Sequence, residues 1–221
     1  MSGVYIYISQ TKITNLYNAT RGGKSMGNLA VRLKAPRVEA EVTATHNPGY
    51  EVYRMLHKIR KRPEVDPSII LYQDLEEDPV SVIKFAGQAA IGIADGTFWL
   101  ALAEGSTALL LAGSAASLIS GVAATSAIPE RSDITFASDD PVGASLRSLE
   151  GIRSESVSSG LSFRWQQLHR NYDRHKAVLR HVQGYSIFGA VYPANRTQLR
   201  RVGAANIKRI VVASPIYVEQ I

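Results

Sequence analysis

The pattern of hydrophobic and polar positions predicts short strands and helices from the start of the chain. Val4–Ser9 is a β-branched and aromatic run typical of a buried strand. A helix is expected directly after it, with Ile13, Leu16 and Tyr17 on its apolar face. A second helix is expected at Tyr50–Arg62, because apolar residues recur there every three or four positions.

Further strands are expected along the rest of the chain. The pair at Thr97–Ala103 and Thr107–Ala112 is typical of a hairpin, because Glu104-Gly105-Ser106 lies between the two runs. The other predicted strands are Leu29–Thr45 (a pair or one bent strand), Ser68–Tyr72, Val80–Phe85, Ala89–Ile93, Tyr185–Tyr192 and Arg209–Val218. Short helices are expected at Ala115–Ser120, Pro141–Ile152 and Pro193–Val202, with loops at Ala123–Asp140 and Ser154–Ser162.

The strongest periodicity lies near residues 161–182. Its apolar members alternate spacings of four and three, which predicts one long helix of roughly 20 residues. They are Leu161, Trp165, Leu168, Tyr172, His175, Leu179 and Val182. Because helices and strands mix without regular alternation, we expect a single α+β domain over residues 1–221, with one mixed or mostly antiparallel sheet flanked by helices.

Composition narrows the class of protein. Of the 221 residues, 45% are hydrophobic, which excludes a globally disordered chain. The chain has no cysteine, so disulfides, thiolate metal sites and cysteine nucleophiles are excluded, and a reducing cytoplasm is expected. The uncharged stretch Gly105–Ile128 is long enough to span a membrane, but its Ser, Thr and Gly content favours a hairpin followed by a short helix. We therefore expect no membrane association, with a marginal span as the alternative.

Charge is strongly segregated along the chain, although the net charge is only +6. Residues 1–62 hold 11 basic and 3 acidic residues, residues 63–146 hold 2 and 12, and residues 147–221 hold 12 and 4. One interpretation is that the acidic middle pairs with the basic ends, within one chain or between copies in a homo-oligomer. The other is that the basic ends converge on one face to bind a polyanion.

Three groups of cations are the candidate anion-binding residues. The first closes the predicted helix at Tyr50–Arg62, where the helix dipole favours cations in any case. Guanidinium groups also match phosphate oxygens in pairs, which is the functional interpretation. The candidates are Arg60, Lys61 and Arg62 in the first group, Arg174 and Arg180 in the second, and Arg200 and Arg201 in the third.

The sequence patterns for metal binding and for a phosphate-binding loop are weaker. His169, His175 and His181 recur every six residues, so on one helix they would point in three directions and could not hold one metal ion. Arg21-Gly22-Gly23-Lys24-Ser25 lacks the first glycine of a phosphate-binding P-loop, since position 18 is Asn. No catalytic residue, metal site or cofactor is therefore predicted.

Three stretches resemble an uncharacterised family of bacterial hypothetical proteins. The first is Val4-Tyr5-Ile6-Tyr7-Ile8-Ser9 with Lys12 and Leu16 behind it, an aromatic-rich strand followed by Ser and a Lys-containing helix. The others are the hairpin Phe98–Ala112 with Gly113-Ser114, and the closing strand Val211–Val218. The resemblance carries no established activity, so it implies no catalytic residue.

The leading hypothesis is a non-enzymatic bacterial cytoplasmic module that binds an anionic ligand. That ligand would be a nucleotide, a nucleic acid or an acidic protein surface. One alternative is an enzyme that acts on a phosphorylated substrate, with a histidine as acid or base. Another is a structural subunit that assembles through its apolar seam and edge strands. The distribution of the three cation groups over the surface is the observation that separates these hypotheses best.

Overall fold

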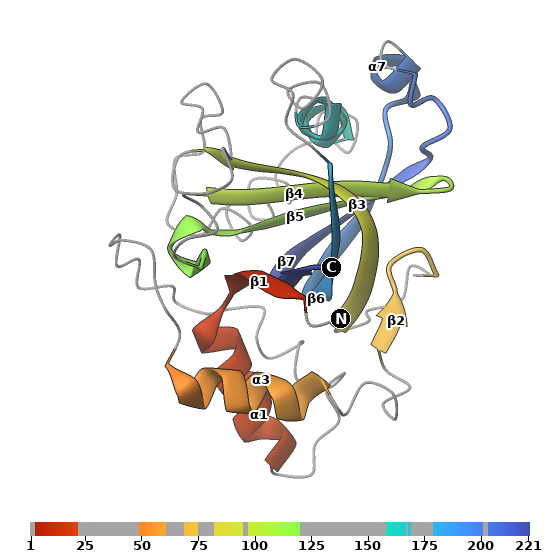
Figure 1. Ribbon diagram of the computed structural model, residues 1–221. Helices are drawn as coiled ribbons and strands as arrows, with labels where there is room; N and C mark the ends of the chain where they lie inside the picture. Colours follow the sequence, from red (N-terminus) through yellow and green to blue (C-terminus); the bar gives the residue numbers. More distant parts are fainter. Residues whose placement is uncertain are drawn as a thin grey trace.

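The computed structural model describes residues 3–21, 49–60, 69–74, 82–94, 97–119, 158–166, 168, 179–200 and 203–221 (Figure 1). The elements are, in chain order, β1 Val4–Ile8, α1 Gln10–Arg21, α3 Tyr50–Arg60, β2 Ile69–Leu71, β3 Val82–Ala94, β4 Thr97–Glu104, β5 Thr107–Ser114, the 3-10 turn η1 Ala115–Ser117, β6 Arg180–Pro193, α7 Arg196–Arg200 and β7 Arg209–Gln220. Residues 158–166 and 168 are helical as well, and we call this segment helix 158–168. The elements predicted at Leu29–Thr45, Ala123–Asp140 and Pro141–Ile152 lie outside the described residues.

Five strands close into a barrel, which corrects the expected single sheet flanked by helices. β3 pairs with β4, β4 with β5, β5 with β7 and β7 with β6, and β6 returns to β3. Only the contact between β5 and β7 is parallel within this ring. β1 extends the wall beside β7, and β2 extends it beside β3. The mixture of helices and strands was predicted, but the closure depends on pairing between distant segments, which periodicity does not encode.

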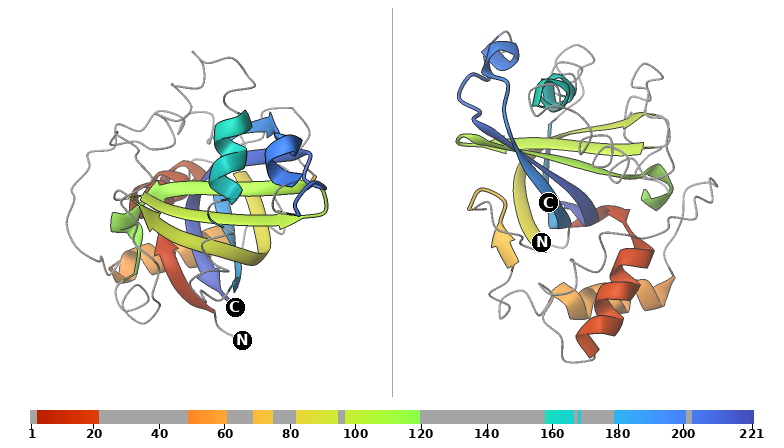
Figure 2. Two further views of the ribbon diagram at one scale, coloured as in Figure 1. Left: turned by 90° about the horizontal axis from the view of Figure 1, so that it is seen from above. Right: turned by 180° about the vertical axis from the view of Figure 1, so that it is seen from behind.

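The barrel has the connectivity of an OB fold. Numbered one to five along the chain, the strands β3 to β7 follow the order 1-2-3-5-4 around the barrel, and helix 158–168 comes between the third and the fourth. OB folds commonly bind ligands on the outer face of strands two and three. Here these strands are β4 and β5, which are buried along nearly their whole length, and helix 158–168 and α7 lie over this side of the barrel (Figure 2). That face is therefore closed to a ligand.

β3 is one long strand, where the sequence predicted two. Its first half pairs with β6 and its second half with β4, and Ala89 pairs with both. Gly87, between the halves, has a φ of 146°, which side-chain-bearing residues rarely adopt. Glycine at this position lets the strand bend around the barrel.

Hydrophobic side chains form two cores. The first joins the barrel strands with helix 158–168 and α7. Within it, Tyr7 stacks on Phe98 with ring centroids 4.9 Å apart, and burial raises the pKa of Tyr7 to about 12. The second lies between the wall of β1, β6 and β7 and the pair α1 and α3, which pack together at one end of the molecule (Figure 1). Both predicted apolar faces are confirmed, and their buried members are Ile13, Leu16, Val52, Leu56 and Ile59.

The long helix predicted near residues 161–182 is wrong in its extent. Its described part begins at residue 158, inside the stretch expected as a loop, and ends at residue 168. Its members Leu161, Trp165 and Leu168 are buried, as the seam predicted. Val182, however, belongs to β6, where residues 182–187 pair with β3 on one side and β7 on the other. Two ladders of hydrogen bonds outweigh the helical spacing there.

Among the described residues, no helix has both the length and the apolar character needed to cross a membrane. The described part of the uncharged stretch Gly105–Ile128 consists of a tight turn, β5, η1 and the bridge residues 118–119. This agrees with the hairpin predicted there. The helix predicted at Ala115–Ser120 is a single 3-10 turn.

Candidate anion-binding surface

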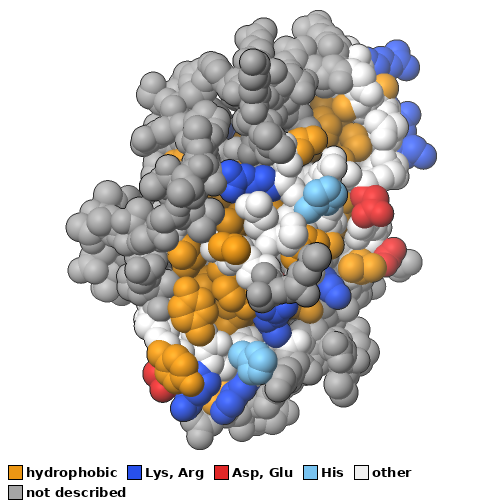
Figure 3. Space-filling view, in the orientation of Figure 1, with side chains coloured by type: hydrophobic (Ala, Val, Ile, Leu, Met, Phe, Trp, Pro, Cys, Tyr) orange, Lys and Arg blue, Asp and Glu red, His pale blue; other side chains and the backbone are white. Residues whose placement is uncertain are grey.

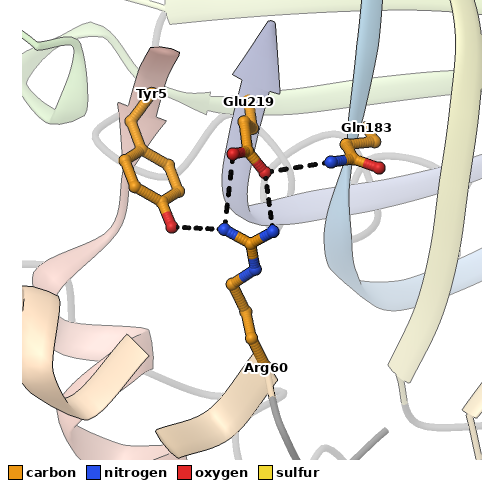
Figure 4. A network of polar contacts seen from close by, with 4 residues as sticks. All are labelled: Tyr5, Arg60, Gln183 and Glu219. Carbon is orange, nitrogen blue, oxygen red and sulfur yellow. Dashed lines mark hydrogen bonds and ion pairs between the residues drawn. The ribbon is translucent and has the colours of Figure 1, made fainter. Parts of the chain in front are cut away.

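Arg60, the described member of the first cation group, is bound into the fold (Figure 4). It ends α3, and its Nη1 donates a hydrogen bond of 2.7 Å to the hydroxyl of Tyr5. Its Nη2 lies 3.2 Å from Oε2 of Glu219, to which Gln183 also donates a hydrogen bond of 3.1 Å. The side chain of Glu219 is only 4% exposed, against 35% for Arg60.

The surroundings of Arg60 favour its charged form. Burial opposes the charge, but the hydrogen bond with Tyr5 and the nearby Tyr5, Tyr217 and Glu219 together raise the pKa of Arg60 above its ordinary value. Its guanidinium carbon lies 5.9 Å from the ring centres of both tyrosines. A buried carboxylate needs a counterion, and Arg60 supplies it while fastening α3 to the barrel. A ligand anion at Arg60 would compete with Glu219. Lys61 and Arg62 lie outside the described residues.

In the second group, only Arg180 is described. Arg180 is the first residue of β6, and its Nη1 donates a hydrogen bond of 3.1 Å to Oε1 of Gln220. Arg174 lies outside the described residues. α3, which carries Arg60, and α7, which carries Arg200, lie at opposite ends of the molecule (Figure 1). Arg60 and Arg200 therefore do not belong to one cluster.

The third group lies on α7, whose ends are fixed by local sequence. Asn195 caps the start, since its side-chain oxygen accepts a hydrogen bond of 3.2 Å from the backbone N–H of Gln198. Gly203, with a φ of 71°, turns the chain after the helix, and the N–H of Ala204 then bonds to the carbonyl of Leu199. Leu199 is fully buried and anchors α7, whereas Arg196 and Arg200 are exposed. Arg201 lies outside the described residues.

Helix 158–168 holds the same segment from the side. The backbone N–H of Asn195 donates a hydrogen bond of 2.8 Å to the hydroxyl of Ser162, and its side-chain amide donates one of 2.8 Å to the hydroxyl of Ser159. Gln166 donates to the carbonyl of Gln198 at 3.4 Å. The two helices consequently lie side by side (Figure 2). The serines that suggested a loop are the contacts that dock α7.

The segment around α7 carries exposed cations, and neither it nor helix 158–168 has an Asp or Glu among its described residues. Arg196 and Arg200, one turn apart on α7, are exposed, as is Lys208, whose backbone carbonyl bonds to the N–H of Ala194 at 2.8 Å. We call Arg196, Arg200 and Lys208 the α7 surface. Residues 158–166, 168, 193–200 and 203–208 contain no Asp or Glu. Lys and Arg side chains accordingly lie at the α7 end of the molecule (Figure 3).

The described residues offer little support for a catalytic or metal-binding site. No three His, Cys, Asp or Glu side chains come together there as a metal site would require. His57 is exposed at the end of α3, and His181 is exposed on β6, with Nε2 3.2 Å from Nε2 of Gln88. Neither forms an ion pair with a carboxylate of the described residues. An enzyme with a histidine acid or base stays a prediction.

Two polar contacts escaped the sequence analysis. Lys12, in the first turn of α1, donates to the hydroxyl of Ser214 and, at 2.9 Å, to the carbonyl of Pro215. The register of β7 against β6 shifts at Pro215, so Lys12 stabilises an irregular part of the ladder. The other is Glu219, the counterion of Arg60. Its signal was available, since a lone carboxylate at the end of an apolar strand predicts a buried ion pair.

Comparisons with known proteins give a family without an assigned activity. The model of a family described as "Family of unknown function (DUF7019)" matches residues 4–221. No curated protein and no solved structure matches the chain. The match spans all three stretches on which the resemblance to an uncharacterised family rested. The chain therefore belongs to the DUF7019 family of unknown function.

Proposed function

We propose that this protein is a binding module for an anionic ligand, which it takes up at the α7 surface. The observation that carries the proposal is the excess of exposed cations in this region. Arg196, Arg200 and Lys208 are exposed, and helix 158–168, α7 and residues 203–208 contain no Asp or Glu among their described residues. The exposed carboxylate of Glu104 adjoins the turn that Lys208 contacts, and it accepts a hydrogen bond from Gln73. An excess of cations creates a positive potential that attracts anions and raises their local concentration.

Rigidity of the α7 segment supports the same proposal. Asn195 ties it to helix 158–168, and the side-chain amide of Asn206 donates a hydrogen bond of 2.8 Å to the carbonyl of Gly105 in the turn between β4 and β5. The backbone N–H of Lys208 bonds to the carbonyl of Ser106 in that turn at 2.8 Å. A segment held in place before binding loses less entropy when a ligand arrives. The connection between strands four and five is also a ligand-binding region in OB folds, which is an analogy of fold only.

The test is binding of the whole chain to a panel of anions at about 50 mM salt, where phosphate contacts are strong. The panel holds inorganic polyphosphate, a labelled oligonucleotide, mononucleotides and cyclic nucleotides. We expect binding to the longer anions, and we expect it to weaken in the double variant Arg196→Ala/Arg200→Ala.

A matched control exists on α3. Arg54 and Lys58 are also exposed cations four residues apart on a surface helix. The double variant Arg54→Ala/Lys58→Ala should bind as the natural protein does. Equal losses in the two double variants would show that only net charge matters, and the α7 surface would then have no special role.

A further inference from the structure

The α7 surface has an exposed aromatic neighbour, Phe163, on helix 158–168. Phe163 is 50% exposed, whereas Trp165, two residues later in the same helix, is 6% exposed. Among the described residues, no aromatic ring within stacking distance of Phe163 is found.

Helix geometry places Phe163 on the flank that faces α7. At 100° per residue, Phe163 lies about 40° from Ser159 and about 60° from Gln166 around the helix axis. Ser159 and Gln166 are the side chains that bond to Asn195 and Gln198 at the start of α7. Arg164, by contrast, points to the opposite flank, with its guanidinium carbon 5.8 Å from the ring of Trp99 on β4. Phe163 is therefore exposed on the flank of helix 158–168 that lies toward α7, the helix that carries Arg196 and Arg200.

From this juxtaposition we infer that the anionic ligand is a single-stranded nucleic acid, whose bases stack on Phe163 while Arg196 and Arg200 contact its phosphates; the inference rests on the proposed function. A free aromatic ring beside guanidinium groups is the arrangement that binds single strands, because every base offers a face to the ring and every nucleotide offers a phosphate to a cation. A duplex keeps its bases stacked inside and can use only the cations. Polyphosphate likewise carries the charge but has no base.

The experiment compares three probes on the natural protein and two variants. The probes are a labelled single-stranded oligonucleotide, the duplex of the same length and inorganic polyphosphate, each followed by fluorescence anisotropy or competition at one salt concentration. Phe163→Leu keeps an apolar side chain and removes the ring. Arg196→Ala/Arg200→Ala removes the charges and keeps the ring.

We expect the natural protein to bind the single strand more tightly than the duplex. Phe163→Leu should weaken binding of the single strand about 5- to 100-fold, and it should leave binding of polyphosphate unchanged. Arg196→Ala/Arg200→Ala should weaken binding of all three probes. Phe163→Trp should retain the single-strand preference, and its added tryptophan emission should change with the oligonucleotide but not with polyphosphate.

The failures of the two proposals are distinguishable. Binding of polyphosphate that depends on Arg196 and Arg200, together with equal affinity for single strand and duplex, would overturn the nucleic-acid inference and leave the anion-binding function standing. An unchanged single-strand affinity in Phe163→Leu would overturn it as well. If the natural protein bound none of the three probes, both proposals would be overturned.

Discussion

Replacing Arg60 by Met should destabilise the fold without weakening anion binding. The substitution keeps most of the apolar length of the side chain and removes the guanidinium. Glu219, 4% exposed, would lose its counterion and keep only the hydrogen bond from Gln183, and Tyr5 would lose its donor. Breaking a fully buried ion pair costs about 3–5 kcal/mol. Because Arg60 is itself 35% exposed and Gln183 remains, we expect a smaller loss of about 1–3 kcal/mol.

The assay is urea denaturation followed by tryptophan fluorescence, since Trp99 and Trp165 are both buried. A double-mutant cycle with Glu219→Gln isolates the pair. We expect a coupling energy of about 1–2 kcal/mol, because the neutral amide no longer needs the guanidinium.

The control for this cycle lies on the same helix. Arg54 pairs with Glu51 at 3.5 Å, with side chains that are 54% and 62% exposed, so Arg54→Met should cost less than about 0.5 kcal/mol. The view that Arg60 is the counterion of Glu219 would be refuted by one result. It is a loss of unfolding free energy in the double variant that equals the sum of the losses in Arg60→Met and Glu219→Gln to within about 0.3 kcal/mol.

The other predictions concern the barrel and its helices. Leu168→Ala should lower the free energy of unfolding by about 2–5 kcal/mol, because Leu168 is 6% exposed and packs over Gly92; an unchanged melting midpoint would contradict its place in the core. Gly184→Ala should be at least as harmful, because a Cβ would lie 2.2 Å from the carbonyl oxygen of Tyr217, and a variant of natural stability would disprove this close approach of β6 and β7. The protein should lose stability as the pH rises from about 10 to about 12, because Tyr7 in the unfolded chain ionises near pH 10 while its folded pKa is about 12. This loss, up to about 2.7 kcal/mol from Tyr7, should be smaller in Tyr7→Phe when unfolding is measured across this pH range, and equal losses in both proteins would argue against the shift.

Local periodicity predicted the elements well, but not the way they close on one another. β1, α1, α3, the hairpin of β4 and β5, and β7 all lie where apolar spacing placed them. The error at residues 180–182 arose because a run of apolar residues can satisfy helical spacing, while the pairing of β6 with both β3 and β7 is a property of the whole barrel. Closure, the bend at Gly87 and the register shift at Pro215 likewise depend on contacts between distant segments.

The candidate surface was partly visible in the sequence. Arg200 stood out in a basic helix, and the structure describes it as an exposed cation on α7. Arg60 stood out for the same reason, yet its guanidinium is occupied by Glu219, since charge counting along the chain does not reveal which cations find partners. Phe163 could have been noticed, because it lies off the apolar seam of its helix, and an aromatic residue at such a position is expected to face solvent.

The salt dependence of oligonucleotide binding tests the central claim most directly. The logarithm of the binding constant for a single strand should fall by about 0.7 per tenfold increase in salt for each phosphate neutralised. Removing Arg196 and Arg200 should therefore reduce the slope by about 1.4, whereas Arg54→Ala/Lys58→Ala should leave it unchanged. The same slope in all three proteins, or no binding by the natural protein at about 50 mM salt, would contradict an anion-binding function of the α7 surface.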